Sequence, residues 1–239
     1  MNASFPVAIP AEPYEFTLTP GACALLVIDM QRDFLEPGGF GEALGNDVSL
    51  LRRTIAPIEL LLAAWRSRGL TVMHTREGHR PDLTDLPAAK HRRGRGPLRI
   101  GDPGPMGRLL IRGEAGHAII PQLVPLLGEV VIDKPGKGAF WATDLHGELQ
   151  RRHIRQLVVT GVTTEVCVHT TVREANDRGY DCLVPSDGVA SYFPELHSAG
   201  LAMIKAQGGI FGWVSDSEKI LSALIPPAHS GSFLAKEAE

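Results

Sequence analysis

The chain has 239 residues, of which 44% are hydrophobic, and a formal net charge of −3. A chain of this length and composition can bury a core without disulfides or metal ions, and its slight acidity gives no overall attraction to nucleic acid or to an anionic membrane. We therefore expect a small molecule as the partner, with no role for nucleic acid or a membrane.

The cysteine count and the hydropathy pattern indicate the cellular compartment. Three cysteines, an odd number without CxxC spacing, argue against a disulfide framework and against a thiolate zinc site. No apolar run approaches the roughly 20 residues that cross a bilayer, and the first residues show no basic segment followed by an apolar one. We expect a cytoplasmic protein.

Short apolar runs alternate with amphipathic segments, a pattern typical of repeated βα units and a mainly parallel sheet. The sequence predicts one three-layer, doubly wound α/β domain over residues 21–226, with tails at 1–20 and 227–239. Gly69 and Gly179 stand where helix C-caps are expected. Six strands are expected at residues 24–28, 71–74, 129–132, 157–160, 182–185 and 209–213. Helices are expected at residues 48–68, 143–152, 165–178, 195–207 and 217–223.

Residues 76–116 interrupt this alternation and are rich in Gly, Pro and Arg. A structureless insertion of this length in a compact domain is usually functional or disordered. We interpret it as a loop over the functional site or at a subunit contact. Its basic cluster at residues 91–96 is better explained as a solvated surface than as a specific anion site.

Cys167 opens an expected helix, which follows the strand at 157–160 across a turn at residues 161–164. The free N–H groups and the dipole at a helix start favour a thiolate and can stabilise an oxyanion. A free cysteine that simply packs under a helix is the commoner situation. Cys23 and Cys182, which lie in apolar runs, are expected to be such core residues. Position makes Cys167 the candidate nucleophile.

Two charged residues stand where other expected strands end, Asp29 after the first and Lys134 after the third. In an open parallel sheet, ligands bind at the carboxyl ends of the strands, near the point where strand order reverses. A strand order of 3-2-1-4-5-6 makes strands 1 and 4 neighbours, which places Asp29 beside Cys167. Singly, a turn aspartate and a solvated lysine explain these residues well. Together with Cys167 they form a complete set for acyl transfer.

Residues 26–34, Lys134 with 139–144, and 160–168 resemble the isochorismatase-like cysteine hydrolases, and the resemblance extends over residues 23–224. It implies a catalytic triad of Asp29, Lys134 and Cys167. It also implies a cis peptide before Thr163, whose N–H joins that of Cys167 in an oxyanion hole. A homo-oligomer, commonly a tetramer, is implied as well.

A closer resemblance, to the biuret and triuret hydrolases, lies at residues 74–82, 100–105, 133–138, 173–179 and 205–212. These enzymes cleave small condensed ureas, and the resemblance implies that Gln207 contacts the substrate. Phe34 is a further candidate substrate-binding residue. The segment 211–216 also resembles the ureidoacrylate amidohydrolases, so a ureidoacrylate or another N-carbamoyl amide is the alternative substrate.

The expected reaction is cysteine-dependent hydrolysis of a ureide C–N bond through a thioester. Asp29 deprotonates Cys167 and then protonates the departing nitrogen, while Lys134 favours the ionised forms of both. Nicotinamidases of the family hold a metal after the second strand, but the spacing of His74 and His79 does not match, so we expect neither metal nor cofactor. A binding module without turnover is the remaining alternative.

Overall fold

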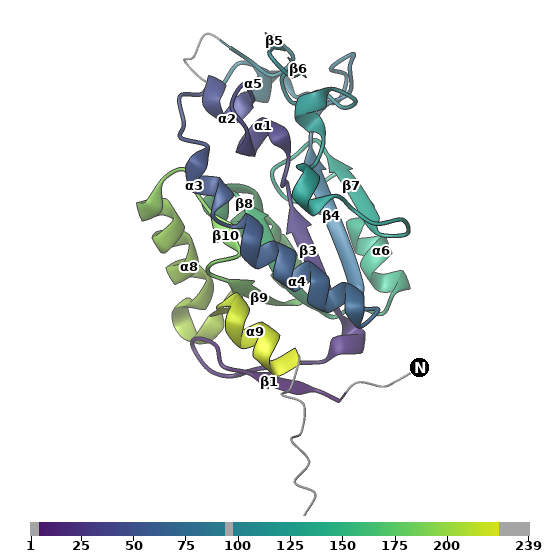
Figure 1. Cartoon of the computed structure of the whole chain (residues 1–239), viewed down its shortest axis with the longest axis vertical. Coiled ribbons are helices and arrows are strands. Elements are labelled where there is room, and N and C mark those ends of the chain that lie inside the picture. The colour runs from purple at the N-terminus through teal and green to yellow at the C-terminus, as the bar shows by residue number, and fades with distance from the viewer. Residues whose placement is uncertain (1–4, 94–97, 225–239) are drawn as a thin grey trace, which may run out of the picture.

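The computed structural model of the protein describes residues 5–93 and 98–224. Its central sheet is parallel, with the order β11-β9-β8-β3-β4-β7 (Figure 1). In chain order this is the predicted 3-2-1-4-5-6. A short seventh strand, β10 (Val189–Ala190), also pairs with β8, so the sheet has one strand more than predicted. The six others are β3 (Cys23–Ile28), β4 (Thr71–Glu77), β7 (Val130–Lys134), β8 (Gln156–Val162), β9 (Asp181–Pro185) and β11 (Trp213–Ser215).

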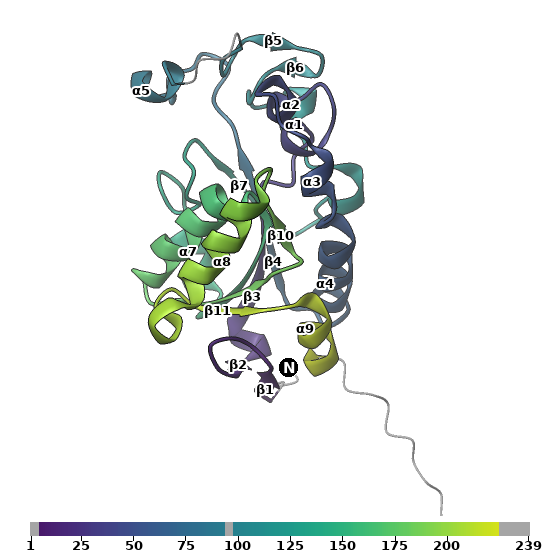
Figure 2. The same ribbon diagram turned by 90° about the vertical axis from the view of Figure 1, so that its left-hand side faces the viewer.

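Helices cover both faces of the sheet, which explains why its central strands are apolar on both sides. Every residue of β3 is buried; Leu25 and Val27 face one core, and Leu26 and Ile28 the other. Figure 2 shows α4 and α9 on one side and α7 and α8 on the other. The principal helices are α4 (Ile55–Ser67), α6 (Leu145–Arg151), α7 (His169–Asn176), α8 (Pro194–Gly209) and α9 (Ser217–Leu224).

The helix predicted over residues 48–68 is divided into α3 (Ser49–Arg52) and α4. Pro57 lacks the N–H that would bond to the carbonyl of Arg53, and the Thr54 hydroxyl donates to the Leu51 carbonyl at 2.9 Å. The predicted caps are confirmed, because Gly69 and Gly179 adopt positive φ angles of 63° and 80° beyond their helices.

The N-terminal segment is part of the fold, so the prediction of a tail over residues 1–20 is wrong for the described residues from 5 onward. Strands β1 (Val7–Ile9) and β2 (Phe16–Leu18) pair antiparallel and bury Ile9, Phe16 and Leu18 in the core. Strands of three residues are too short to show periodicity, which is why the sequence pattern missed them. The predicted C-terminal tail at 227–239 lies outside the described residues.

Two strands have other bounds than predicted. Strand β4 runs three residues further than predicted, to Glu77, and the last strand, β11, begins four residues later than predicted.

The segment after β4 carries helices and strands of its own. The side chain of Asp33 anchors the segment, accepting a hydrogen bond from the Leu110 N–H at 3.0 Å. Its elements lie at the end of the molecule opposite β1 and β2 (Figure 2), namely α5 (Ala88–His91), β5 (Pro103–Gly104), β6 (Gly107–Arg108) and the 3₁₀ turn η2 (Ala115–His117).

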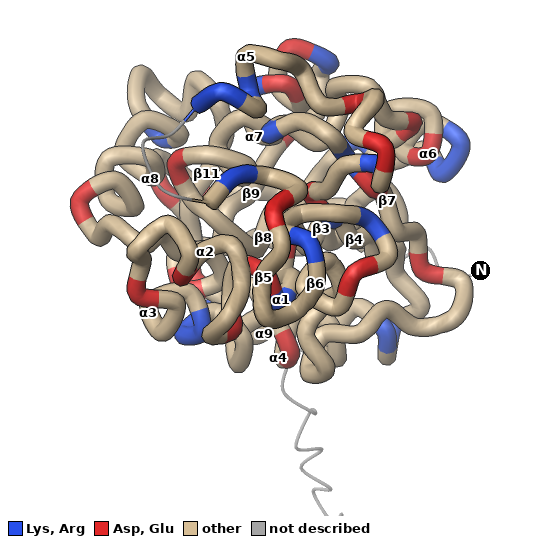
Figure 3. Tube along the Cα trace, turned by 90° about the horizontal axis from the view of Figure 1, so that it is seen from above, with Lys and Arg blue, Asp and Glu red and all other residues tan. Residues whose placement is uncertain are grey.

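The remaining short elements complete the description: η1 (Pro20–Ala22), α1 (Arg32–Leu35), α2 (Phe40–Ala43) and η3 (Pro121–Leu123). Within the described ranges, none of the helices has the length and apolar character needed to cross a membrane. Acidic and basic residues are interspersed along the trace when the molecule is viewed from above (Figure 3). Local groups of charges, rather than a field of one sign, therefore set the electrostatics of the site described next.

Candidate active site

The structure brings Asp29, Lys134 and Cys167 together at the carboxyl end of the sheet. Asp29 directly follows β3, and Lys134 is the last residue of β7. Cys167 lies in the π-helical turn η4 (Thr164–Val168), which follows β8 and continues into α7. Because β3 and β8 are paired neighbours, Asp29 and Cys167 emerge side by side. All three are buried, with exposed fractions of 0%, 0% and 5%.

Lys134 is fixed by one carboxylate and two carbonyl groups. Its Nζ lies 2.7 Å from Oδ2 of Asp29 and donates to the carbonyls of Gly136 and Lys137 at 2.9 Å each. The other carboxylate oxygen of Asp29 accepts a 2.7 Å hydrogen bond from the Thr75 hydroxyl. Burial alone would lower the pKa of Lys134, but Asp29 above all outweighs it and raises the pKa above its usual value. The ammonium group is therefore permanently charged.

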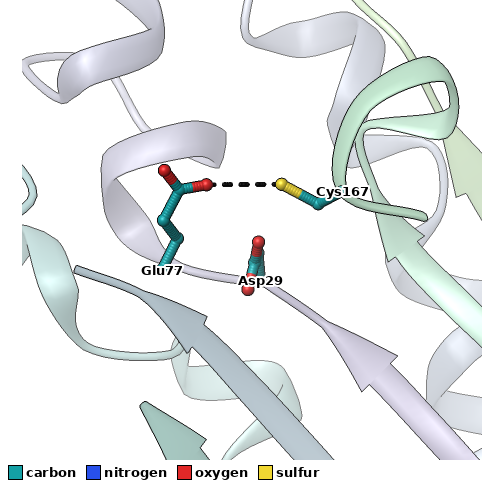
Figure 4. A group of neighbouring side chains, drawn as sticks. All are labelled: Asp29, Glu77 and Cys167. Atoms are coloured by element: carbon teal, nitrogen blue, oxygen red, sulfur yellow. Dashed lines mark hydrogen bonds between the residues drawn. The ribbon is translucent and has the colours of Figure 1, made fainter. Parts of the chain in front are cut away.

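Glu77 is a fourth buried residue of this group that sequence reasoning missed. It ends β4 and pairs in register with Lys134 of β7. Its Oε2 accepts a hydrogen bond from Sγ of Cys167 at 3.3 Å (Figure 4), and its Oε1 accepts from Nζ of Lys90 and Lys137 at 2.7 and 2.8 Å. The strand-end rule that selected Asp29 and Lys134 selects Glu77 too, once β4 is given its full length.

The lysines decide the charge state of Glu77. Burial alone would raise its pKa, but the ammonium groups of Lys134, Lys137 and Lys90 outweigh burial and hold the pKa well below its usual range. The carboxylate is therefore ionised at neutral pH. Asp29 and Glu165 add two further carboxylates around the thiol, so three lysines stand against three carboxylates.

The thiol of Cys167 is protonated at rest. Burial raises its pKa well above the ordinary value; Lys134 opposes this shift, while Asp29 and Glu77 add to it. Burial and the two carboxylates thus act against the thiolate that the helix start was expected to favour. Attack by this sulfur requires a base to take the proton as the bond forms.

A small pocket opens above the sulfur. Its volume is about 200 Å³, below the roughly 300–1,000 Å³ of pockets for drug-sized ligands. Lys137, Glu77 and Glu165 supply its charged lining next to Cys167. The rest of the lining is mostly apolar and includes Phe34, Phe40, Leu44, Val162, Thr163, Val166, Tyr192 and Phe193. This volume suits a small metabolite.

Residues 23–219 of the chain match the Isochorismatase domain. The chain belongs to the isochorismatase family. It is 34% identical to a ureidoacrylate amidohydrolase, RutB, of Methylobacterium radiotolerans, over 94% of this chain and 88% of that protein. A solved isochorismatase family protein from Desulfovibrio vulgaris is 28% identical, with a TM-score of 0.69 over 83% of this chain and 96% of the other.

A solved cysteine hydrolase from Pseudomonas syringae has a similar fold. It aligns with a TM-score of 0.72 over 94% of this chain and 98% of the other, at 23% identity. The peptide between Val162 and Thr163 is cis, as the family resemblance implied. The protein is thus an isochorismatase-family hydrolase with a doubly wound α/β fold.

The two residues expected to bind substrate are placed differently by this isochorismatase-family fold. Phe34 lines the pocket, as expected. Gln207 is exposed at the last turn of α8, about 20 Å along the helix from Phe193, and does not line the pocket. Ala206, Gln207 and Gly208 have left the helical conformation there. The structure therefore does not bring Gln207 to the site within one chain.

The acidic and thiol groups do not fit a metal ion. Ligand atoms of Asp29, Glu77 and Cys167 lie within 4.8 Å of one another, but Nζ of Lys134 already lies 2.7 Å from Asp29 and 3.6 Å from Glu77. A cation would have to displace this ammonium group. Nε2 of His74 is not available either, because it contacts Glu129 at 3.1 Å.

Proposed function

We propose that the protein is a cysteine-dependent amidohydrolase that cleaves a C–N bond of a small ureido acid of the ureidoacrylate type. The observation that carries the proposal is the Cys167 thiol at the base of a small pocket, beside Asp29 and the ammonium groups of Lys134 and Lys137. The 34% identity to a ureidoacrylate amidohydrolase over nearly the whole chain supports this alternative over a biuret or triuret substrate.

Lys137 offers a contact for an anionic substrate. Lys137 lines the pocket, and 45% of its side chain is exposed, whereas Lys90 and Lys134 are largely or fully buried. A carboxylate entering the pocket can form a charge-assisted hydrogen bond with Lys137. Biuret and triuret are uncharged at neutral pH and have no carboxylate to form this contact.

The proposed reaction begins with proton transfer from Cys167 to Asp29. The sulfur attacks the ureido carbonyl carbon, and the C=O electron pair moves to oxygen. That pair returns as the C–N bond breaks, and Asp29 passes its proton to the departing nitrogen. Water then attacks the carbamoyl thioester and restores the thiol. The ammonium group of Lys134 stabilises the ionised Asp29 and the thiolate in turn.

Two backbone N–H groups are proposed to hold the oxyanion. Thr163 and Cys167 both line the pocket, and Thr163 has an extended backbone immediately before η4. The first N–H groups of a helix have no intrahelical partner and are available to a developing negative charge. In this proposal the oxyanion lies on the side of the carbonyl that faces the helix start.

A substrate panel tests the proposal. Purified protein and Cys167→Ala are incubated with ureidoacrylate, N-carbamoyl amino acids, biuret, triuret and nicotinamide, and the release of amine and ammonia is followed. Cysteine-dependent turnover of the acids, well above that of biuret and triuret, is the expected result. Turnover of biuret or triuret alone would instead support a biuret or triuret hydrolase. Binding without turnover would support a binding module.

A further inference from the structure

The thiol of Cys167 is directed at Glu77. Its Sγ donates to Oε2 of Glu77 at 3.3 Å, while the nearest charged neighbour of Asp29 is Lys134. Glu77 is fully buried, with an exposed fraction of 0%. A carboxylate is costly to bury unless its partners satisfy it. The proposed reaction uses Asp29, Lys134 and Cys167 and gives this buried carboxylate no role.

Glu77 also gathers lysines from separate segments. Lys134 ends β7, Lys137 follows it on the pocket wall, and Lys90 comes from α5 in the segment beyond β4. Lys90 also donates to the carbonyl of Pro135 at 2.7 Å and contacts Nε2 of His79 at 2.9 Å. Through one carboxylate, the segment that follows β4 is tied to the nucleophile and to the pocket wall.

The same contacts argue against Glu77 as the base. Two ammonium groups donate to its Oε1 and a third lies 3.6 Å from its Oε2, so its ionised form is strongly favoured. A carboxylate held in this way accepts a hydrogen bond well but takes a proton poorly. Asp29 lies against one lysine and the hydroxyl of Thr75. The base role therefore stays with Asp29.

We infer that Glu77 is a positioning residue of the reaction centre, which orients the Cys167 sulfur through the S–H···O hydrogen bond and holds Lys137 on the pocket wall. The inference rests on the proposed function for the choice of substrate but not for the thiol measurement below. A sulfur displaced by about 1 Å is expected to slow attack by about 100-fold.

The charged and titratable groups facing the thiol set the sign of a second effect. They are Asp29 after β3, Glu77 of β4, Lys134 of β7, Lys137 beyond it, Tyr192 across the pocket and Glu165 of its own turn. Glu77→Gln removes one negative charge from this set. The thiol pKa should therefore fall. Turnover should still be slower, because the sulfur has lost the contact that orients it, although the thiol ionises more readily.

The experiment combines turnover with the pH profile of iodoacetamide alkylation. Glu77→Gln is expected to lower kcat about 100-fold and to shift the alkylation midpoint to lower pH. Glu77→Asp keeps the charge but shortens the side chain, so it should lower kcat with a midpoint near that of the wild type. Glu129→Gln is the matched control. Like Glu77, Glu129 is paired with basic side chains, in its case Arg66 and His74, but it does not line the pocket.

The two readouts keep the inference separate from the proposed substrate. If no member of the panel is turned over, the alkylation profile still tests Glu77. A Glu77→Gln protein with wild-type kcat, or with an unchanged alkylation midpoint, overturns the inference. If Glu77→Gln does not fold, wild-type kcat in folded Glu77→Asp overturns it equally.

Discussion

The two ends of the central sheet bury side chains of opposite kinds. At the carboxyl end, Asp29, Glu77 and Lys134 are fully buried around Cys167. At the amino end, β1 and β2 bury Leu18 and their other apolar residues in the core beneath the sheet. The strands of the central sheet contribute to the core along their length and carry the site residues at or just after their last residues. Substitutions at the two ends should separate turnover from folding.

The three cysteines sharpen this comparison. Burial raises the pKa of each thiol, that of Cys23 to about 12. Cys23 and Cys182 have apolar surroundings within β3 and β9, as predicted, whereas Cys167 is surrounded by carboxylates and ammonium groups. Burial alone therefore does not mark a nucleophile. The neighbouring groups that can take, hold and return a proton do.

The largest effect should come from Cys167→Ala, which removes the attacking atom. We expect turnover to fall by more than about 1,000-fold, while the thermal unfolding midpoint changes little. Cys182→Ala, equally buried in the same core, is the matched control and should keep its turnover while losing some stability. Substrate hydrolysis and thermal melts of both variants measure this. Residual turnover within tenfold of the wild type would remove Cys167 from the mechanism.

Asp29→Asn should have the next largest effect. The amide occupies the same space but cannot take the thiol proton, and general-base contributions are about 100- to 10,000-fold. Lys134 also loses the partner that most strongly raises its pKa. Single-turnover kinetics should show that formation of the thioester is slowed. Asp33→Asn, which alters a buried carboxylate that anchors the segment after β4, should spare this step; equal slowing in both would contradict the assignment.

At the apolar end, Leu18→Ala should act on stability alone. Leu18 is fully buried, and truncating a buried leucine costs about 2–5 kcal/mol of unfolding free energy. Urea denaturation should show this loss, with kcat of the folded protein unchanged. A fall in kcat without a loss of stability would show that the two ends of the sheet are coupled.

A smaller effect is expected from Lys137→Gln. If Lys137 binds the substrate carboxylate, its loss should raise KM for an anionic ureido acid by about tenfold, in line with a hydrogen bond to a charged group. The uncharged amide of the same acid should show little change. Lys219→Gln, at an exposed lysine of α9, is the control. An equal rise in KM for both substrates would argue against carboxylate recognition.

The sequence alone predicts the frame of the site because strand order places strand ends together. Asp29, Lys134 and Cys167 each follow an apolar run, and the order 3-2-1-4-5-6 brings Asp29 next to Cys167. Glu77 was missed because the apolar pattern of β4 fades before the strand ends. Its role depends on Lys90, thirteen residues away, whose approach no periodicity encodes.

The sequence does not predict charge states inside the site. A helix start favours a thiolate in isolation, but the pKa of Cys167 depends on how deeply the sulfur lies and on which carboxylates face it. The position of Gln207 likewise depends on where α8 ends and how its last turn unwinds. Both are properties of packing between distant segments, which a linear pattern does not contain.

The smallest predicted effect concerns acid stability and again contrasts the two ends. The pKa of Glu77 lies below its usual value of 4.5, because its three lysines outweigh burial. Below that pH the unfolded chain binds a proton that the folded chain does not, so the stability from this ionised group is present above about pH 4.5 and is lost as the pH falls. Urea midpoints from about pH 6 to pH 3 should therefore fall more steeply for the wild type than for Glu77→Gln, with a slope difference that approaches one bound proton only below about pH 4. Leu18→Ala should keep the wild-type slope, since it removes only apolar contacts; a slope unchanged in Glu77→Gln would show that the lysines do not hold this carboxylate in its charged form.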